Sequence, residues 1–92
     1  MIRLNVFFLI EKSENCVPLV KAATELVSMS LRDKGCIDYD LFASATNDDR
    51  MMIVETWRSE DDLKDHMESE HFKRIVPQLQ QLATMTFERF DF

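Results

Sequence analysis

The first ten residues contain the pattern that most constrains the fold of this chain. Apolar side chains occupy every even position and would share one face of a β-strand: Ile2, Leu4, Val6, Phe8 and Ile10. The odd positions would form the other face, which is also half apolar: Arg3, Asn5, Phe7 and Leu9. A strand with two largely apolar faces is expected to be covered on both of them. We therefore expect helices over one face and a second subunit against the other.

The remaining hydrophobic pattern predicts two helices and three further strands. Helical spacing runs from Val17 to about Lys34 and again through residues 60–82, whereas period-two alternation occupies residues 37–43, 51–57 and 84–92. The order β-α-β-β-α-β is that of a ferredoxin-like α+β fold with an antiparallel sheet. With 92 residues, the chain is expected to form one domain over residues 1–92.

Three short motifs mark the ends of these elements. Gly35, the only glycine, follows the first helix at the position where a left-handed backbone conformation ends a helix. Residues 59–62, Ser-Glu-Asp-Asp, have the form of a capping box that opens the second helix. Ser69 is a further capping candidate, so we expect the second helix to break or shift near this residue.

The net charge excludes some classes of partner, and the cysteine spacing indicates the cellular compartment. The net charge is −6 and no basic stripe is present, which argues against nucleic acid or an anionic membrane surface as a partner. The longest fully apolar run, Val6 to Ile10, is too short to span a bilayer. Cys16 and Cys36 lack a Cys-x-x-Cys spacing, so we expect two free thiols in a reducing, cytoplasmic environment.

Glu55 is the first candidate for chemistry, because it shares a predicted strand face with Ile53 and Trp57. A carboxylate on such a face is either half exposed or buried with a partner. In the functional interpretation it orients a histidine or accepts a proton, with a raised pKa if the site is dry. In the structural interpretation it is a rim glutamate paired with an arginine.

His66 and His71 are the next candidates. On one unbroken helix they would lie about 140° apart around the axis and would not share a face, whereas a break near Ser69 would allow both to reach one cleft. Each histidine is otherwise a surface or helix-end residue. Metal sites on helices typically use pairs at i, i+3 or i, i+4 together with a third ligand, so no metal is expected.

Asn5, Trp57 and Tyr39 complete the set of candidates. A buried Asn5 amide would hydrogen-bond a ligand, and otherwise the residue lies near an edge of the sheet. Trp57 is either a core residue or the wall of a pocket for an aromatic ligand, and the hydroxyl of Tyr39 needs a partner. The sequence has no Ser/His/Asp order, phosphate-binding glycine loop or dinucleotide fingerprint, which argues against a flavin or nucleotide cofactor.

Several of these residues together resemble the signature of the antibiotic biosynthesis monooxygenase family. The matching residues form a Gly-Cys-x-x-Tyr strand, a Glu-x-Trp strand and a helix with His followed by Ser-x-His-Phe: Gly35, Cys36, Tyr39, Glu55, Trp57, His66, Ser69, His71 and Phe72. The resemblance implies a ferredoxin-like monomer that dimerises through its sheets into an α+β barrel. Some members of the family oxidise quinols or polycyclic aromatics with molecular oxygen and use no flavin, haem or metal.

The resemblance also implies roles for individual residues. Trp57, Tyr39 and Phe72 would line the substrate pocket, together with His71. His66 would be the catalytic base, with His71 as the second candidate for that role. Glu55 would orient the base, and Asn5 would hold a substrate oxygen. The expected partners are a small aromatic or quinol-like substrate, molecular oxygen and a second copy of the chain.

Other branches and classes supply alternative functions. An isomerase of a phosphorylated signalling sugar would need a basic phosphate site. The basic residues available for such a site are scattered: Lys64, Lys73 and Arg74. The resemblance places the axial histidine of a haem-degrading branch near Val76, which cannot ligate iron, so haem degradation is disfavoured unless His71 takes that role. A dimer that binds a small hydrophobic ligand without catalysis remains as an alternative from a different class.

Overall fold

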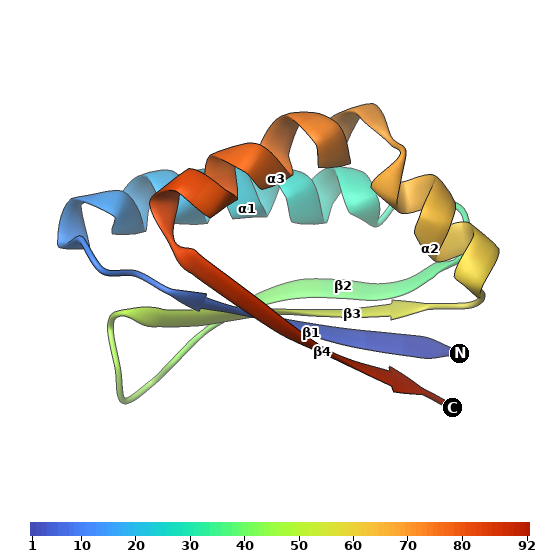
Figure 1. Ribbon diagram of the computed structural model, residues 1–92, viewed down its shortest axis with the longest axis horizontal. Coiled ribbons are helices and arrows are strands. Elements are labelled where there is room, and N and C mark those ends of the chain that lie inside the picture. Colours follow the sequence, from blue (N-terminus) through green and yellow to red (C-terminus); the bar gives the residue numbers. More distant parts are fainter.

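The computed structural model describes residues 1–92 and shows a four-stranded sheet with every helix on one of its faces (Figure 1). The elements follow in the order β1 (Ile2–Leu9), a 3-10 turn (Ser13–Asn15), α1 (Cys16–Ser30), β2 (Cys36–Ala43), β3 (Arg50–Trp57), α2 (Glu60–Met67), α3 (Glu70–Leu82) and β4 (Thr84–Asp91). All strand pairs are antiparallel and the spatial order is β2-β3-β1-β4. The ferredoxin-like α+β prediction is confirmed, with the second predicted helix divided into α2 and α3.

The core lies between the sheet and the two long helices. It contains buried side chains from the upper face of the sheet and from the facing sides of α1 and α3: Ile2, Phe8, Tyr39, Ile53, Trp57, Leu19, Ala23, Leu26, Ile75 and Leu79. Burial of these apolar side chains supplies the main favourable free energy of folding. The prediction that helices cover one face of β1 is therefore confirmed, and the structure shows that this is the even-numbered face.

The connection between α1 and β2 differs in detail from the prediction. The helix ends at Ser30 and not near Lys34, and residues 31–35 form turns before β2 begins. Gly35 has a φ of +79° as expected, and a Cβ atom there would come within 2.1 Å of the Asp62 carboxylate. A β-bulge between Cys36 and Asp38 leaves Ile37 46% exposed, although alternation predicts it on the face of Tyr39.

Two serine caps fix the start of α2 and the break before α3. The Ser59 hydroxyl accepts a hydrogen bond from the backbone N–H of Asp62 at 3.2 Å, which confirms the predicted capping motif. The Ser69 hydroxyl accepts from the N–H of Phe72 at 3.2 Å and donates to the carbonyl of His66 at 2.6 Å. The predicted break at Ser69 is therefore present, and it changes the direction of the chain between His66 and His71.

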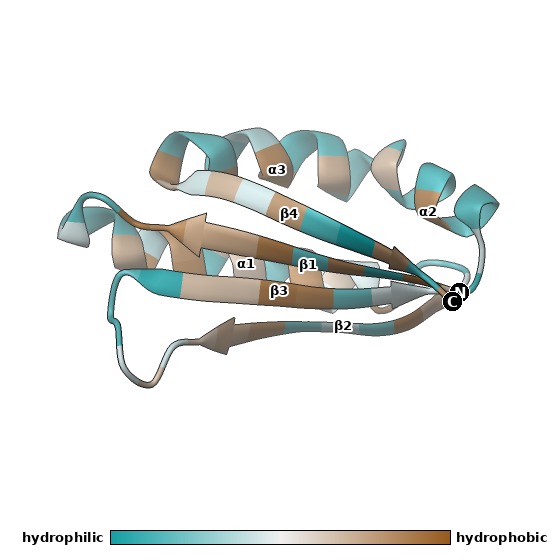
Figure 2. Ribbon diagram, turned by 60° about the horizontal axis from the view of Figure 1, so that its bottom comes forward, coloured by the Kyte–Doolittle hydropathy of each residue, from teal (hydrophilic) through white to brown (hydrophobic).

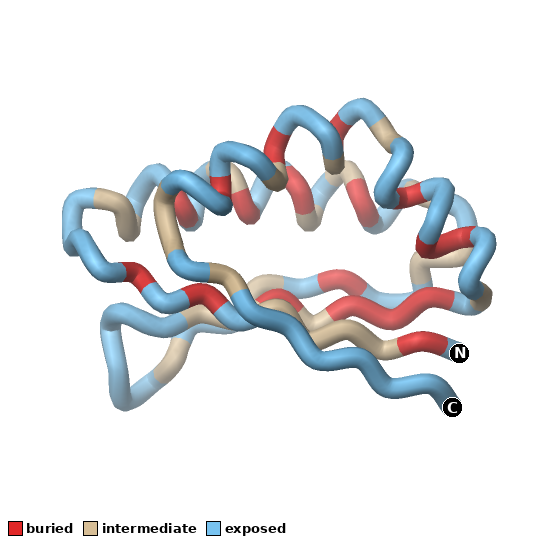
Figure 3. The backbone as a smooth tube through the Cα atoms, viewed as in Figure 1, coloured by how far each residue is buried: buried red, intermediate tan, exposed pale blue.

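The other face of the sheet carries no helix (Figures 1 and 3). Figure 2 shows that the central strands β1 and β3 are largely hydrophobic, whereas β4 has a hydrophilic stretch before its hydrophobic tip. The large apolar side chains that this open face exposes are Phe7, Leu9, Phe42 and Phe90. None of the helices is long and apolar enough to cross a membrane.

Candidate active site

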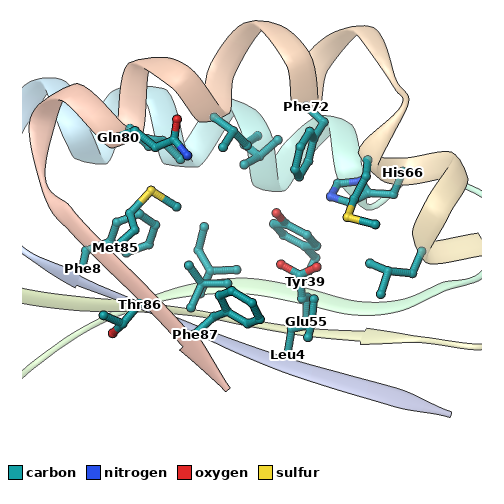
Figure 4. A pocket seen from close by; sticks show the side chains of 17 residues that line it. Leu4, Phe8, Tyr39, Glu55, His66, Phe72, Gln80, Met85, Thr86 and Phe87 are labelled. Carbon is teal, nitrogen blue, oxygen red and sulfur yellow. The ribbon is translucent and has the colours of Figure 1, made fainter. Parts of the chain in front are cut away.

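A cavity of about 340 Å³ opens between the sheet and the helices α2 and α3 (Figure 4). Most of its wall is apolar and comes from β1, β3, β4 and α3, including Leu4, Val6, Phe8, Ile53, Val76, Leu79 and Met85. Its volume lies at the small end of the range for small-molecule sites. The cavity therefore has room for a compact hydrophobic ligand.

Three polar side chains gather at the end of the cavity nearest α2 (Figure 4). Tyr39 on β2 and Glu55 on β3 are cross-strand partners, and both project from the sheet toward the helices. His66 on α2 faces them from above, beside Phe72. An otherwise apolar ligand is thus offered a polar contact at one end of the site.

Glu55 is a buried carboxylate with one direct hydrogen bond. The indole Nε1 of Trp57 donates to its Oε1 at 2.8 Å, and the residue is only 4% exposed. Burial raises the pKa of Glu55 to about 7, against the opposing effects of Trp57 and Tyr39, which lower it. Near neutral pH this side chain is therefore present in both protonated and ionised forms.

Aromatic rings surround the imidazole of His66 and fix its position. The ring centroids of Trp57, Phe72 and Tyr39 lie 4.5, 5.2 and 5.6 Å from that of His66. Burial lowers the pKa of His66, although nearby Asp33 acts in the opposite direction. Its Nε2 is buried and has no hydrogen-bond partner within the protein. A buried nitrogen of this kind is available to a ligand.

The other nitrogen of His66 contacts a residue that sequence reasoning did not select. His66 Nδ1 lies 2.8 Å from Asp33 Oδ2, and His71 Nε2 lies 2.7 Å from the same oxygen. Asp33 belongs to the turn after α1, so 33 positions separate it from His66 and no spacing rule links the two. These three side chains also place atoms of metal-binding types within 4.8 Å of one another. Their mutual hydrogen bonds already satisfy those atoms.

The structure brings together some of the predicted site residues but not all of them. Tyr39, Glu55, His66 and Phe72 line the cavity. Trp57 and His71 lie behind this wall, where they contact Glu55 and Asp33 respectively.

Asn5 is on the opposite face of the sheet, where its amide donates to Glu88 Oε1 at 2.9 Å. The structure therefore does not bring Asn5 to the cavity. The predicted link between Glu55 and His66 is also replaced, because Asp33 is the carboxylate that binds the imidazole.

The cavity contains no cationic side chain of lysine or arginine. Lys73 is paired with Glu68 at 2.9 Å, and Arg74 with Glu25 and Glu70 at 2.7 Å each, all on the exterior. A phosphate group would thus find no cation in this site. Val76 also lines the cavity, and its side chain offers no atom that could ligate a metal.

Comparisons with known proteins identify relatives over most of the chain. Residues 7–78 match the family model described as antibiotic biosynthesis monooxygenase. The candidate monooxygenase YcnE of Bacillus subtilis strain 168 is 29% identical over 73 residues, which span 79% of this chain and 77% of that protein. A crystal structure from Bacteroides thetaiotaomicron, of a protein of unknown function described as a possible oxidoreductase, is 43% identical with a TM-score of 0.95. It covers 99% of this chain and 96% of that one.

A more distant likeness concerns the fold alone. SnoaB from Streptomyces nogalater, described as a cofactor-independent oxygenase, was crystallised as a point mutant and is 13% identical with a TM-score of 0.88. The alignment covers 99% of this chain and 91% of SnoaB.

Proposed function

This chain belongs to the antibiotic biosynthesis monooxygenase family, and from that premise we propose that it oxidises a quinol or polycyclic phenolic compound with molecular oxygen and no cofactor. The observation that carries the proposal is the unpartnered Nε2 of His66, which is buried beside an apolar cavity. A neutral imidazole in this position is suited to take a proton from a bound substrate.

The walls of the cavity favour a neutral aromatic substrate. Apolar side chains form most of the surface, and Phe72 and Tyr39 offer aromatic contacts near the polar end. A carboxylate or phosphate would lose its hydration without gaining a cationic partner, which costs several kcal/mol by order of magnitude. Two or three fused rings with a hydroxyl or keto group at the polar end fit both the volume and the polarity.

The chemistry begins with proton removal by His66. A keto tautomer such as anthrone loses a C–H proton to Nε2 and becomes an enolate. The enolate transfers an electron to molecular oxygen, and the two radicals combine to form a carbon–oxygen bond. The proton held by His66 then passes to the peroxide, and loss of water leaves a carbonyl group. One oxygen atom enters the product and the other becomes water, with the substrate supplying all the electrons.

Glu55 and Tyr39 would bind the oxygen substituent of the substrate. Because the pKa of Glu55 is about 7, its protonated form can donate a hydrogen bond to the developing enolate oxygen at neutral pH. Trp57 holds the carboxyl group in place through its 2.8 Å hydrogen bond. The apolar walls exclude water, which strengthens these contacts and protects the reactive intermediates.

A homodimer is part of the same proposal. The open face of the sheet exposes Phe7, Leu9 and Phe42 with no helix over them. Exposed apolar side chains that cluster on one face commonly mark an association surface. A second copy of the chain, packed face to face on this sheet, would bury them and leave the cavity on the far side of each sheet.

Oxygen uptake by purified, chelator-treated protein tests the proposed activity. Anthrone and 1,4-naphthoquinol serve as substrates, with heat-denatured protein as the autoxidation control. Saturable uptake proportional to protein concentration is expected, and ¹⁸O₂ should place one labelled atom in the anthraquinone product and one in water. Tight binding of these compounds without uptake above the control would reject the oxygenase and favour a ligand-binding dimer.

A further inference from the structure

The hydrogen bonds of Asp33 determine which nitrogen of His66 carries a proton. An ionised carboxylate only accepts hydrogen bonds. His66 Nδ1, 2.8 Å from Asp33 Oδ2, must therefore be the protonated nitrogen. In the neutral ring Nε2 then has a free lone pair, and this is the buried atom without a protein partner.

His71 contacts the same carboxylate oxygen from α3. Its Nε2 lies 2.7 Å from Asp33 Oδ2 and donates the second hydrogen bond. Because His71 does not line the cavity, its effect on bound substrate must pass through Asp33. The break capped by Ser69 makes this possible, since it brings His66 and His71 to one oxygen despite their separation around a helix.

We propose that Asp33 is a positioning residue that holds His66 in the tautomer whose bare Nε2 faces the cavity, and that His71 anchors Asp33. The proposal extends the function proposed above, because it explains why His66 presents a base and not an N–H donor to the substrate. Without the carboxylate, an imidazole is free to place its proton on Nε2, and that form cannot accept a proton there.

The alternative occupant of this cluster is a metal ion, and the buried Nε2 argues against it. Coordination through Nδ1 of His66 would leave Nε2 protonated, as a donor without a partner in an apolar wall. A metal-ligating histidine usually donates its other N–H to a carboxylate, carbonyl or water. In the hydrogen-bonded arrangement Asp33 Oδ2 takes both imidazoles, and Nε2 of His66 is the buried nitrogen left for the ligand.

Nitrogen NMR of the histidine-labelled protein tests the tautomer without any turnover. At neutral pH we expect His66 Nδ1 to resonate as a protonated nitrogen and Nε2 as a bare one. Asp33→Ala should convert His66 to the Nε2-protonated form or to a mixture of the two. Asp65→Ala, an exposed neighbour of His66 on the same helix, is the control and should leave the spectrum unchanged. A wild-type protein with Nε2 protonated would overturn the proposal, even if Asp33→Ala failed to fold.

Kinetics separate a positioning role from a general structural one. Asp33→Ala should lower kcat by about 100-fold, the lower end of what general acid–base catalysis contributes, with little change in KM, because Asp33 does not line the cavity. The titratable groups around the ring are Asp33, His71, Tyr39 and Glu55, and Asp33 is the one whose contacts raise the pKa of His66. The acid limb of kcat/KM should therefore move to lower pH in the variant. An unchanged kcat and pH profile would contradict the proposal.

The two experiments also distinguish this proposal from the proposed oxygenase activity. A bare Nε2 that depends on Asp33, in a protein that oxidises none of the substrates, would support the positioning role and reject the oxygenase. Active wild-type protein with a protonated Nε2 would retain the oxygenase and reject Asp33 as the residue that fixes the base.

Discussion

Each face of the sheet has a polar side chain among apolar ones, but the two faces differ in how far they are shielded from water. On the helix-covered face, Glu55 lies between Ile53 and Trp57; on the open face, Asn5 lies near Phe7 and Leu9. Each is a polar side chain on an apolar strand, and the pattern alone makes both candidates for a site. Glu55 is 4% exposed and has its pKa raised to about 7, whereas Asn5 hydrogen-bonds Glu88 at the surface.

The difference shows that the covering layer, and not the strand, creates the reactive environment. Helices α2 and α3 exclude water from one face, so charges there lose hydration and their pKa values shift. On the open face, water screens the same kinds of groups. A second subunit would cover that face with apolar contacts, but it would not add the histidine and carboxylates that gather under α2.

The largest expected contrast between the faces is in turnover. His66→Gln keeps a polar side chain of similar length but removes the base, so we expect kcat/KM for anthrone oxidation to fall about 10²- to 10⁴-fold. Asn5→Ala on the open face should change the same parameter by no more than roughly twofold. Oxygen-electrode assays of both variants provide the comparison. Equal losses of kcat/KM would contradict the placement of the active site on the helix-covered face alone.

The next contrast is in the pH dependence of stability. Burial favours protonated Glu55 in the folded protein, with a pKa of about 7 against 4.5 for the ordinary group. The stabilising effect of the protonated side chain is complete below pH 4.5 and is lost as the pH rises through 7. This loss lowers the free energy of unfolding by about 3 kcal/mol. Glu55→Gln should therefore be more stable than wild type by about that amount at pH 8 and nearly equal to it at pH 4.5.

Urea unfolding at the two pH values measures this effect. Glu88→Gln on the open face is the matched control, and its free energy of unfolding should differ from wild type by less than about 0.5 kcal/mol. A Glu55→Gln variant with no gain at pH 8 would show that Glu55 is not held in a dry environment.

The smallest contrast concerns two exposed phenylalanines on opposite faces. Phe42 lies on the open face, and Phe87 lies at the cavity on the helix-covered side. Phe42→Asp should weaken the proposed dimer by about 1 kcal/mol or more, whereas Phe87→Asp should leave it intact. Light scattering over a dilution series measures the dissociation constant, and a monomeric wild-type protein would reject the open face as an interface between copies.

Much of the fold could be predicted because hydrophobic periodicity and the capping and turn residues indicated the same elements. Alternation, helical spacing and the caps at Ser59 and Ser69 identified the elements, and the position of Gly35 correctly predicted its left-handed backbone. The bulge that exposes Ile37 was not predictable, because only Cys36 precedes it in β2, which is too little strand to reveal the shift in alternation.

The site could be predicted only in part. The Glu-x-Trp strand and the histidines mark Glu55, Trp57 and His66, and the structure brings these three together. Asp33 escaped notice because its role depends on where the turn after α1 meets the break before α3, which is a tertiary contact. Asn5 could not be separated from Glu55, because periodicity assigns residues to faces without revealing which face the helices cover.

The most direct test of the cavity beside His66 as the binding site is an NMR titration of ¹⁵N-labelled protein with 2-naphthol, used as a hydroxylated aromatic probe under anaerobic conditions. We expect saturable shifts of the His66 imidazole nitrogens and of the amides of Tyr39, Glu55 and Phe72, with the open face unaffected. Shifts confined to Phe7 and Phe42 would contradict it, as would the absence of any saturable change at His66.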